Sequence, residues 1–386
     1  MEKQTSSAKV KLKLLMAGIM IEKTALEGLG ETYKEYQYGY NDSNWAKKNK
    51  QELIPSELLL PGNFVVAPHI RPTSPFIITK RNDALVIINK NTGEELSKVG
   101  YLPRPKIWDL HLSNGESIKK YLNIYGMDCL NLFILADCEF WNVGRPCVFC
   151  SLKPTQVFHN EVVKFKVIDK IDEALQLAFS SGDIIKWMII TGGSRLNRQE
   201  EIDRYCNVLN CIGKHIPISW NHKIQGNAAL LPSMDISDLI KLHKTGICHP
   251  SFNLEVWDKE LFDQYCPGKA KYIGFDNLLS IYKNAVEIWG RGEVWCNFVG
   301  GISPIQKLKD GFRYMADMGV VPGANIFHVD PSAPAAKLGL TQPTEDYVLE
   351  MYHELGKIYR EYGYRPYFSH SVLRNSLANE VFNGWL

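Results

Sequence analysis

The sequence predicts a mixed α/β protein built on a parallel sheet covered by helices. Between residues 130 and 329, six apolar runs alternate with segments of helical periodicity. The predicted strands are residues 130–136, 184–191, 216–220, 247–254, 294–299 and 320–329. The predicted helices between them are residues 168–180, 198–212, 235–244, 273–289 and 304–318. This alternation is typical of parallel β/α folds, which are either open doubly wound sheets or barrels. No G-x-G-x-x-G follows the first strand, so the dinucleotide-binding version of the open sheet loses support.

Residues 1–128 have a different pattern and are predicted to form an N-terminal α+β cap or extension. Helix-compatible apolar spacing at the start is followed by two strands, 76–79 and 84–89, that flank a KRND turn. A second turn, NTGE, precedes a third strand at 99–102, so a small antiparallel meander is expected. Residues 103–127 are predicted to be a linker.

The end of the chain, residues 336–386, is predicted to form a helical and aromatic extension. A helix is expected over 345–362, followed by the aromatic segment YGYRPYFSHS and a last helical stretch. We expect this tail to pack onto the central sheet.

Composition excludes several classes of function. The chain has 386 residues, 44 Lys and Arg against 42 Asp and Glu, and a formal charge of +2. This balance offers no electrostatic footprint for nucleic acid or an anionic membrane, and small-molecule chemistry is favoured. Nine cysteines without the dense spacing of a disulfide scaffold indicate a reducing compartment, so we expect a cytoplasmic protein. No stretch approaches the ~20 apolar residues that cross a bilayer.

Three cysteines follow the first predicted strand and are the main functional signal. Cys138, Cys147 and Cys150 stand as C-x8-C-x2-C in one loop. Four sulfurs would suit a closed structural zinc site, whereas three thiolates leave one position open on a metal or cluster. The alternative is a zinc knuckle that His159 completes, nine residues after Cys150.

This loop resembles the cluster loop of the radical S-adenosylmethionine (SAM) superfamily, in which an aromatic residue, here Phe149, precedes the last cysteine. The commonest spacing in that family is C-x3-C-x2-C, from which the eight residues between Cys138 and Cys147 depart. The resemblance implies a partial (β/α)6 TIM-like barrel over residues 129–335. It also implies a [4Fe-4S] cluster on the three cysteines and SAM on the fourth iron, at the mouth formed by the carboxyl ends of the strands.

Later strands carry further likenesses to the family. Gly192, Gly193 and Ser194 end the second strand and resemble the Gly-Gly-Glu-like motif that meets the amino group of SAM, with Ser194 replacing the acidic residue. The alternative is a plain strand-to-helix turn.

Asn253 and Glu255 lie two apart in the fourth predicted strand and would share one face of it. They resemble the N-x-[DE] ribose-binding strand of the biotin-synthase-like branch. The alternative for Glu255 is a carboxylate that pairs with a helix terminus or a lysine. The fifth strand is apolar and ends in glycine, and by resemblance Val299 supports the adenine ring.

Other polar or sulfur side chains at predicted strand ends are candidates for the substrate and for chemistry. The candidate substrate-binding residues are Asn221, His222 and Asn297. The candidate catalytic residues are Cys266, Cys296, His328 and Asp330. The remaining cysteines, including Cys206 and Cys211 on one helix, are expected to be packing residues, because free cysteine is among the most buried residue types.

The resemblance implies an enzyme that cleaves SAM reductively and removes hydrogen from a small molecule, with flavodoxin or ferredoxin as electron donor. Rearrangement, carbon–carbon cleavage or another C–H functionalisation is favoured, and sulfur insertion or methyl transfer is the alternative. Outside the family, a zinc-dependent β/α-barrel hydrolase, a zinc-stabilised binding protein and a non-catalytic binding module stay open.

Overall fold

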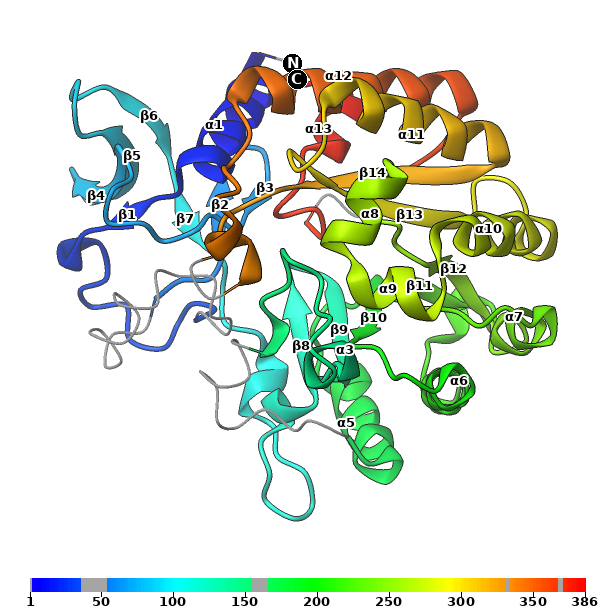
Figure 1. The fold of residues 1–386 in the computed structure, drawn as a ribbon. Coiled ribbons are helices and arrows are strands. Elements are labelled where there is room, and N and C mark those ends of the chain that lie inside the picture. Colours follow the sequence, from blue (N-terminus) through cyan, green and yellow to red (C-terminus); the bar gives the residue numbers. More distant parts are fainter. Residues whose placement is uncertain (1, 36–53, 154–165, 331–332, 367–370) are drawn as a thin grey trace.

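A seven-stranded sheet forms the centre of the protein (Figure 1). The computed structural model describes residues 2–35, 54–153, 166–330, 333–366 and 371–386. The strand order is β14-β13-β12-β11-β10-β9-β8. The strands are β8 (Leu122–Tyr125), β9 (Cys129–Leu135), β10 (Trp187–Gly192), β11 (Ile224–Ala229), β12 (Ile247–Ser251), β13 (Val294–Gly300) and β14 (Val320–Ile326).

Strands β9 to β14 pair in parallel in sequence order, and β8 pairs antiparallel with β9. Within the described residues β14 and β8 are the two edges, so the sheet is open rather than a closed barrel. The predicted parallel α/β architecture with six β/α units is confirmed.

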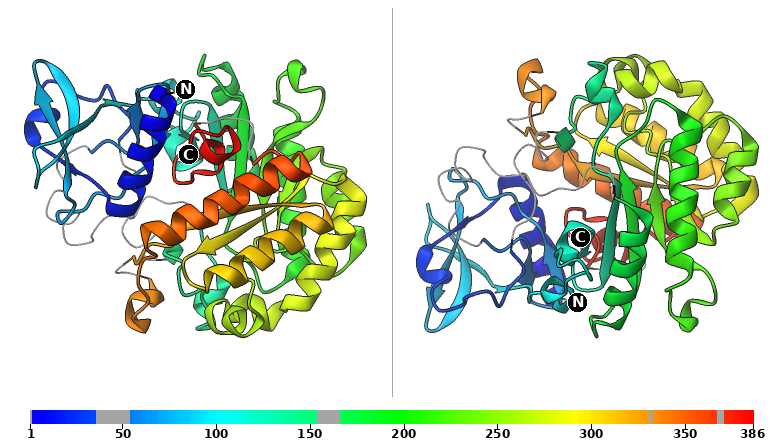
Figure 2. Two further views of the ribbon diagram at one scale, coloured as in Figure 1. Left: turned by 90° about the horizontal axis from the view of Figure 1, so that it is seen from above. Right: turned by 90° about the horizontal axis from the view of Figure 1, so that it is seen from below.

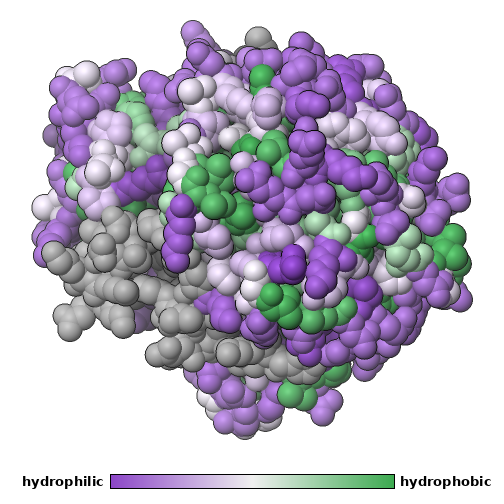
Figure 3. All heavy atoms as spheres, viewed as in Figure 1, coloured by the Kyte–Doolittle hydropathy of each residue, from purple (hydrophilic) through white to green (hydrophobic). Residues whose placement is uncertain are grey.

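Helices cover the outer face of this sheet (Figures 1 and 2). They are α5 (Ile168–Ser180), α6 (Arg198–Gly213), α7 (Ile236–His243), α8 (Lys259–Tyr265), α9 (Pro267–Tyr272), α10 (Phe275–Trp289), α11 (Ile305–Met318) and α12 (Glu345–Tyr362). Several begin at side-chain caps: Asn197, Asp235 and Thr344 each accept a backbone N–H of the first turn, which satisfies an otherwise unpaired donor. Among the described helices, none combines the length and apolarity that a membrane crossing requires. Figure 3 shows polar side chains over most of one face.

The predicted third strand, 216–220, is wrong. Residues Ile218–Trp220 form a 3₁₀ helix, in which Ile218 is 94% exposed, and β11 begins only at Ile224. Asn221 and His222 have φ of 50° and 58° and turn the chain into β11.

The sequence of β11, IQGNAA, has no apolar run because close packing replaces large side chains there. A Cβ on Gly226 would lie 2.7 Å from the carbonyl oxygen of Met188 on β10. The buried amide of Asn227 donates to the carbonyl of His249 at 3.1 Å, which satisfies its polarity inside the sheet.

His249 lies inside the sheet on β12, where it is 3% exposed. Its ring stacks on Trp295, with centroids 4.6 Å apart and planes at 13°. Burial lowers the pKa of His249 to about 4, although its contact with the carbonyl of Glu293 at 3.0 Å works against this. The ring is therefore neutral near pH 7. The nearby Glu293 carboxyl has a raised pKa, because it is itself partly buried.

The N-terminal part consists of α1 (Glu2–Ala17) and two small sheets beside the large one (Figure 2). One sheet has the order β1-β4-β5-β6 and the other β3-β2-β7. Their strands are β1 (Met20–Ile21), β2 (Leu58–Leu60), β3 (Phe64–Val66), β4 (Phe76–Arg81), β5 (Ala84–Asn89), β6 (Glu95–Lys98) and β7 (Gly100–Tyr101).

The predicted meander is confirmed for β4 and β5, but its third strand is β6, since β7 pairs with β2 in the other sheet. The linker predicted over 103–127 is wrong. Two 3₁₀ helices, Lys106–Asp109 and Ile118–Lys120, lead into β8, and Trp108 is 2% exposed.

The C-terminal extension packs onto the large sheet as expected. The hydroxyls of Tyr352 and Tyr359 on α12 donate to carbonyls of β14, at 3.0 and 2.8 Å. The last helix, α13 (Ala378–Phe382), brings the end of the chain beside α1 (Figure 1). There Lys11 and Glu380 form an ion pair at 2.7 Å, with both side chains buried.

Candidate active site

The three cysteines of the C-x8-C-x2-C pattern lie in one loop at the carboxyl end of β9, and each is partly exposed. Cys138 immediately precedes the short helix α3 (Glu139–Asn142). The backbone N–H of Cys150 donates to the carbonyl of Cys147 at 3.1 Å, so the CxxC pair forms a tight turn. All three thiols therefore lie at the edge of the sheet where parallel β/α proteins place their chemistry.

These thiols lie close enough to perturb one another. Burial raises the pKa of Cys138, and the neighbouring thiol of Cys147 adds to the shift. Burial together with Cys147 and Cys138 raises the pKa of Cys150 to about 12. The pKa of Cys147 is raised well above its usual value by a hydrogen bond with Cys266 and by burial.

Backbone N–H groups of Phe140 and Ser194 work against the shift at Cys138, because they donate to its sulfur and favour the thiolate. Gathered thiols that burial keeps protonated become strong ligands once a metal replaces their protons. The donor set thus fits an iron–sulfur cluster or a thiophilic metal.

The predicted SAM-binding segment, residues 192–194 at the end of β10, lies against the first cysteine, Cys138. The N–H of Gly193 donates to the carbonyl of Leu135 at 2.7 Å. A Cβ on Gly193 would lie 2.2 Å from the carbonyl oxygen of Asp137 and 2.6 Å from Cβ of Cys138, so only glycine allows this approach. The carbonyl of Ser194 accepts the N–H of Glu139 at 2.8 Å. These contacts give Gly193 and Ser194 a definite place beside the thiols, and their binding of SAM stays a prediction.

The turn between α8 and α9 packs on the other side of the cysteine loop. The N–H of Val148 donates to the carbonyl of Tyr265 at 2.9 Å. A Cβ on Gly268 would lie 2.5 Å from the ring of Phe140. The thiol of Cys266 interacts with that of Cys147, so a fourth sulfur lies near one of the three loop cysteines. The sequence made Cys266 only a candidate catalytic residue, and the structure places it in contact with the cysteine loop.

Asn253 and Glu255 do not belong to a strand, because β12 ends at Ser251. Their predicted shared strand face is therefore wrong. Glu255 has φ of 71° and bridges to β13 through backbone hydrogen bonds with Asn297 and Val299, at 3.1 and 2.8 Å.

Lys269 connects Asn253 and Glu255. Its ammonium donates to the carbonyl oxygen of Asn253 at 2.6 Å and to Glu255 Oε1 at 2.7 Å. The pairing of Glu255 with a lysine, the alternative considered from the sequence, is thus what the structure contains. Burial alone would lower the pKa of Lys269, but Glu255 and the nearby thiols raise it above its usual value. Lys269 is therefore a fixed positive charge beside the cysteine loop.

A cavity of about 300 Å³ opens next to the cysteine loop. Five of the predicted site residues line it: Phe149, Glu255, Val299, His328 and Asp330. The other lining residues are Ser56, Ala67, Pro68, His69, Ser151, Asn325, Ile326, Phe327, Arg374 and Asn375. The volume is at the lower end of the range for small-molecule sites, about 300–1,000 Å³.

Sequence reasoning missed two walls of this cavity. One comes from residues 56–69 of the N-terminal part, and the other from residues 374–375 of the C-terminal extension. The sole local signal was the unusual density of aromatic and polar residues in the tail, and nothing in residues 56–69 indicated a site. The cavity therefore lies between the three parts of the chain.

His328 follows β14, and its ring lies 4.3 Å from that of His69, measured between centroids. Burial lowers the pKa of His328 well below its usual value, and the neighbouring charges of His69 and Arg71 add to this. Among the described residues, no group forms a hydrogen bond with its Nδ1. A neutral imidazole with one free nitrogen therefore borders the cavity.

The remaining candidates lie elsewhere. Asn221 and His222 precede β11, at the amino edge of the sheet, so the prediction that they follow a strand at the mouth is wrong. Asn297 lines a second, smaller cavity of about 170 Å³. Cys296 is fully buried, and burial raises its pKa to about 12. Cys296 does not line either of these cavities. His159, the alternative zinc ligand, lies outside the described residues.

Comparisons with known proteins add to this geometry. No protein-family model matches the sequence. Bacteriochlorophyllide c C-7(1)-hydroxylase from Chlorobaculum limnaeum is 24% identical over 265 residues, which are 65% of this chain and 64% of that protein. The chain thus matches just under two thirds of the length of this curated relative.

Two solved structures match parts of this chain. A radical SAM methyltransferase from Sphaerobacter thermophilus has a TM-score of 0.43 at 13% identity, covering 76% of each chain. A radical SAM methyltransferase from Kitasatospora setae, with cobalamin and a [4Fe-4S] cluster bound, has a TM-score of 0.38 at 12% identity. It covers 67% of this chain and 48% of that one.

Proposed function

We propose that this chain is a radical SAM enzyme that acts on a small molecule. One observation carries the proposal: three partly exposed thiols gather at the end of the first parallel strand, against the Gly-Gly end of the second and beside a cavity. Cys138, Cys147 and Cys150 would hold a [4Fe-4S] cluster, and SAM would complete its coordination. When bound, the cluster supplies the electron that cleaves SAM into methionine and a 5′-deoxyadenosyl radical, which removes hydrogen from a substrate carbon.

The residues of the chain have distinct tasks in this proposal. The N–H groups of Phe140 and Ser194 stabilise Cys138 as a thiolate. The absence of a side chain at Gly193 lets the second strand approach the loop. Lys269 holds Glu255 at the cavity wall, where its carboxylate can accept hydrogen bonds from ribose hydroxyls.

The cavity walls would shield the radical from solvent and from unintended hydrogen donors. A radical that reaches an unintended hydrogen donor is lost, so the walls must shield it. Residues of the N-terminal part, the sheet and the C-terminal extension together enclose the space. We assign the substrate to this cavity, with His328 and Asp330 as the polar groups that orient it or exchange protons with it.

The reaction that the proposal favours is a C–H functionalisation, rearrangement or cleavage of a metabolite. The curated relative is a hydroxylase by name, and hydroxylation is a reaction of this class. Sulfur insertion and methyl transfer are the alternatives within the superfamily. A flavodoxin or ferredoxin would deliver the electron, and we assign the enzyme to the cytoplasm.

The competing function is a structural zinc site, which one observation favours. Cys266 perturbs the pKa of Cys147 and so lies near it, which adds a fourth sulfur to this region. No three of these four described sulfurs lie within 4.8 Å of one another, so a closed zinc site of four thiolates would require the loop to rearrange. Elemental analysis of protein purified without oxygen separates the two. The cluster proposal expects about four iron atoms and about four sulfide ions per chain. It also expects 5′-deoxyadenosine to form from SAM when dithionite is the reductant.

Two variants sharpen this test. Cys147→Ser is expected to lose iron, sulfide and deoxyadenosine formation, whereas the matched Cys266→Ser is expected to keep them. Stoichiometric zinc without sulfide in the anaerobic wild type would rule out the cluster. Loss of metal in Cys266→Ser as complete as in Cys147→Ser would favour the four-sulfur site.

A further inference from the structure

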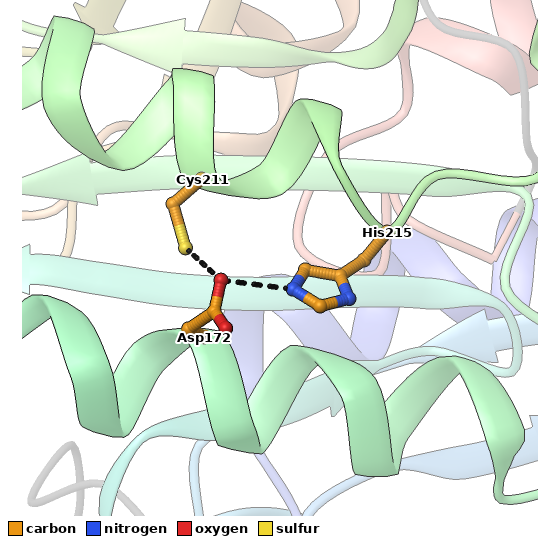
Figure 4. Close-up of side chains that lie close together, drawn as sticks. All are labelled: Asp172, Cys211 and His215. Carbon is orange, nitrogen blue, oxygen red and sulfur yellow. Dashed lines mark hydrogen bonds and ion pairs between the residues drawn. The ribbon is translucent and has the colours of Figure 1, made fainter.

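A second group of side chains that could hold a metal ion lies on the outer helical layer, between α5 and the end of α6 (Figure 4). Asp172 projects from α5, Cys211 from the last turn of α6, and His215 from the residues just after it. Asp172 Oδ1 lies 3.1 Å from Cys211 Sγ and 3.0 Å from His215 Nε2. The three ligand atoms all lie within 4.8 Å of one another.

Local structure explains why these side chains converge. Cys211 and His215 are four residues apart, the spacing that puts two side chains on one face of a helix. Although α6 ends at Gly213, the chain continues to turn, since the N–H of His215 donates to the carbonyl of Ile212 at 2.9 Å. The face they share is the one that packs on α5, where Ile171 and Leu175 are fully buried.

The donor set is chemically selective. A thiolate, an imidazole and a carboxylate suit Zn²⁺, with bonds of about 2.3, 2.0–2.1 and 2.0–2.2 Å. Ligands of a tetrahedral zinc with these bond lengths lie about 3.2–3.6 Å from one another. The two distances to Asp172 are shorter by only a few tenths of an ångström. A metal ion could thus replace the proton that Cys211 gives to Asp172, with small side-chain movements.

Burial across the group is graded. Cys211 is 2% exposed and the side chain of His215 is 17% exposed, whereas that of Asp172 is 40% exposed. The thiol therefore forms the floor of the site, and water can reach the metal from the side of Asp172. The ammonium of Lys214 lies 3.7 Å from Asp172 Oδ1, so a metal ion competes with one exposed cation and not with a buried one.

We propose that Asp172, Cys211 and His215 form a zinc site that ties α5 to α6, with water as the fourth ligand. The site is independent of the proposed radical chemistry, because its residues lie on α5 and at the end of α6 and none of them belongs to the cysteine loop. Zinc binding would release the proton of Cys211 to solvent and shift the Nε2 proton of His215 to Nδ1, so that two hydrogen bonds are replaced by three metal–ligand bonds.

Cobalt(II) tests the site directly, because a thiolate ligand gives a charge-transfer absorption that other donors do not. Full-length, cluster-loaded protein is titrated with Co²⁺ without oxygen, and Zn²⁺ is then added as competitor. The expected result is one equivalent of tetrahedral cobalt with a thiolate band that zinc bleaches. Cys211→Ser is expected to lose the band, and His215→Gln to weaken cobalt binding at least about tenfold.

Cys206→Ser is the matched control, since Cys206 is a buried thiol on the same helix that faces another direction. It is expected to keep the band. The Ser variant of all three loop cysteines is expected to keep it also, which separates this site from the cluster loop. The proposal is overturned if wild-type protein shows no thiolate band, if Cys211→Ser keeps it, or if the loop variant loses it. Circular dichroism verifies that each variant is folded.

Discussion

Gly193→Ala is the sharpest perturbation of the proposed site, because it adds one methyl group where the second strand meets the first cysteine. The added Cβ would lie 2.2 Å from the carbonyl oxygen of Asp137 and 2.6 Å from Cβ of Cys138. Ordinary contacts begin at 3.4 Å, so the two segments must separate by roughly 1 Å. The φ of Gly193 is not in the left-handed region, so the substitution tests packing alone.

The size of the effect follows from this separation. Overpacking of this kind costs about 1–3 kcal/mol of stability. A displacement of about 1 Å at reacting groups costs on the order of 10²-fold in rate. Movement of Cys138 also removes its sulfur from the N–H of Ser194, which weakens the thiolate. We therefore expect a modest fall in Tm together with a large fall in cluster content and SAM cleavage.

The assay measures iron, acid-labile sulfide and 5′-deoxyadenosine in anaerobic preparations, alongside thermal unfolding. Gly213→Ala is the matched control. Gly213 ends α6 with no atom within 4 Å of its added Cβ, and alanine there is expected to stabilise by about 0.5–1 kcal/mol. A Gly193→Ala protein with wild-type iron content and SAM cleavage would refute the placement of this glycine at the cluster.

Three further predictions concern buried or largely buried ionisable groups. Stability of the wild type is expected to fall by up to about 3 kcal/mol between pH 6.5 and 4, because the unfolded chain binds a proton that buried His249 does not. This loss is absent in His249→Phe, and denaturant titrations across that pH range measure the difference. Lys11→Met is expected to cost about 3–5 kcal/mol, because it leaves Glu380 buried without its partner, whereas Lys11→Met with Glu380→Leu recovers most of it. Urea unfolding checks this, and an equally unstable double variant would contradict it. A double-mutant cycle of Glu255→Gln and Lys269→Met is expected to show coupling of about 1–3 kcal/mol in SAM binding by calorimetry, since the pair acts as a unit. Additive effects would count against Glu255 as a ribose ligand.

Local sequence predicted the helices best. The helices over 168–180 and 345–362 were placed to the residue, because their amphipathic faces and, in the second, the Thr344 cap are encoded within each segment. The prediction of the third strand is wrong for the opposite reason. The apolar run before Asn221 is a 3₁₀ turn in which Ile218 is exposed, and the real strand depends on Gly226 fitting against a neighbour that is distant in sequence.

The same distinction holds for the candidate site: its contiguous motifs could be predicted from the sequence, and its contacts between distant segments could not. The three loop cysteines and the glycines of β10 were recognisable because each pattern is short and contiguous. The contact between Cys147 and Cys266, and the pairing of Lys269 with Glu255, join segments that only the fold brings together. No local pattern in residues 56–69 signals a cavity wall, since those residues acquire that role by packing.

The shared construction of the cavity has an evolutionary consequence. The thiols and the Gly-Gly turn follow strands of the large sheet, whereas one wall belongs to residues 56–69 of the N-terminal α+β part. Mutation or recombination in that unit can reshape the space offered to a metabolite while the strands that carry the sulfurs stay untouched. Relatives that share this sheet could therefore bind different substrates while they keep the same first step of the reaction.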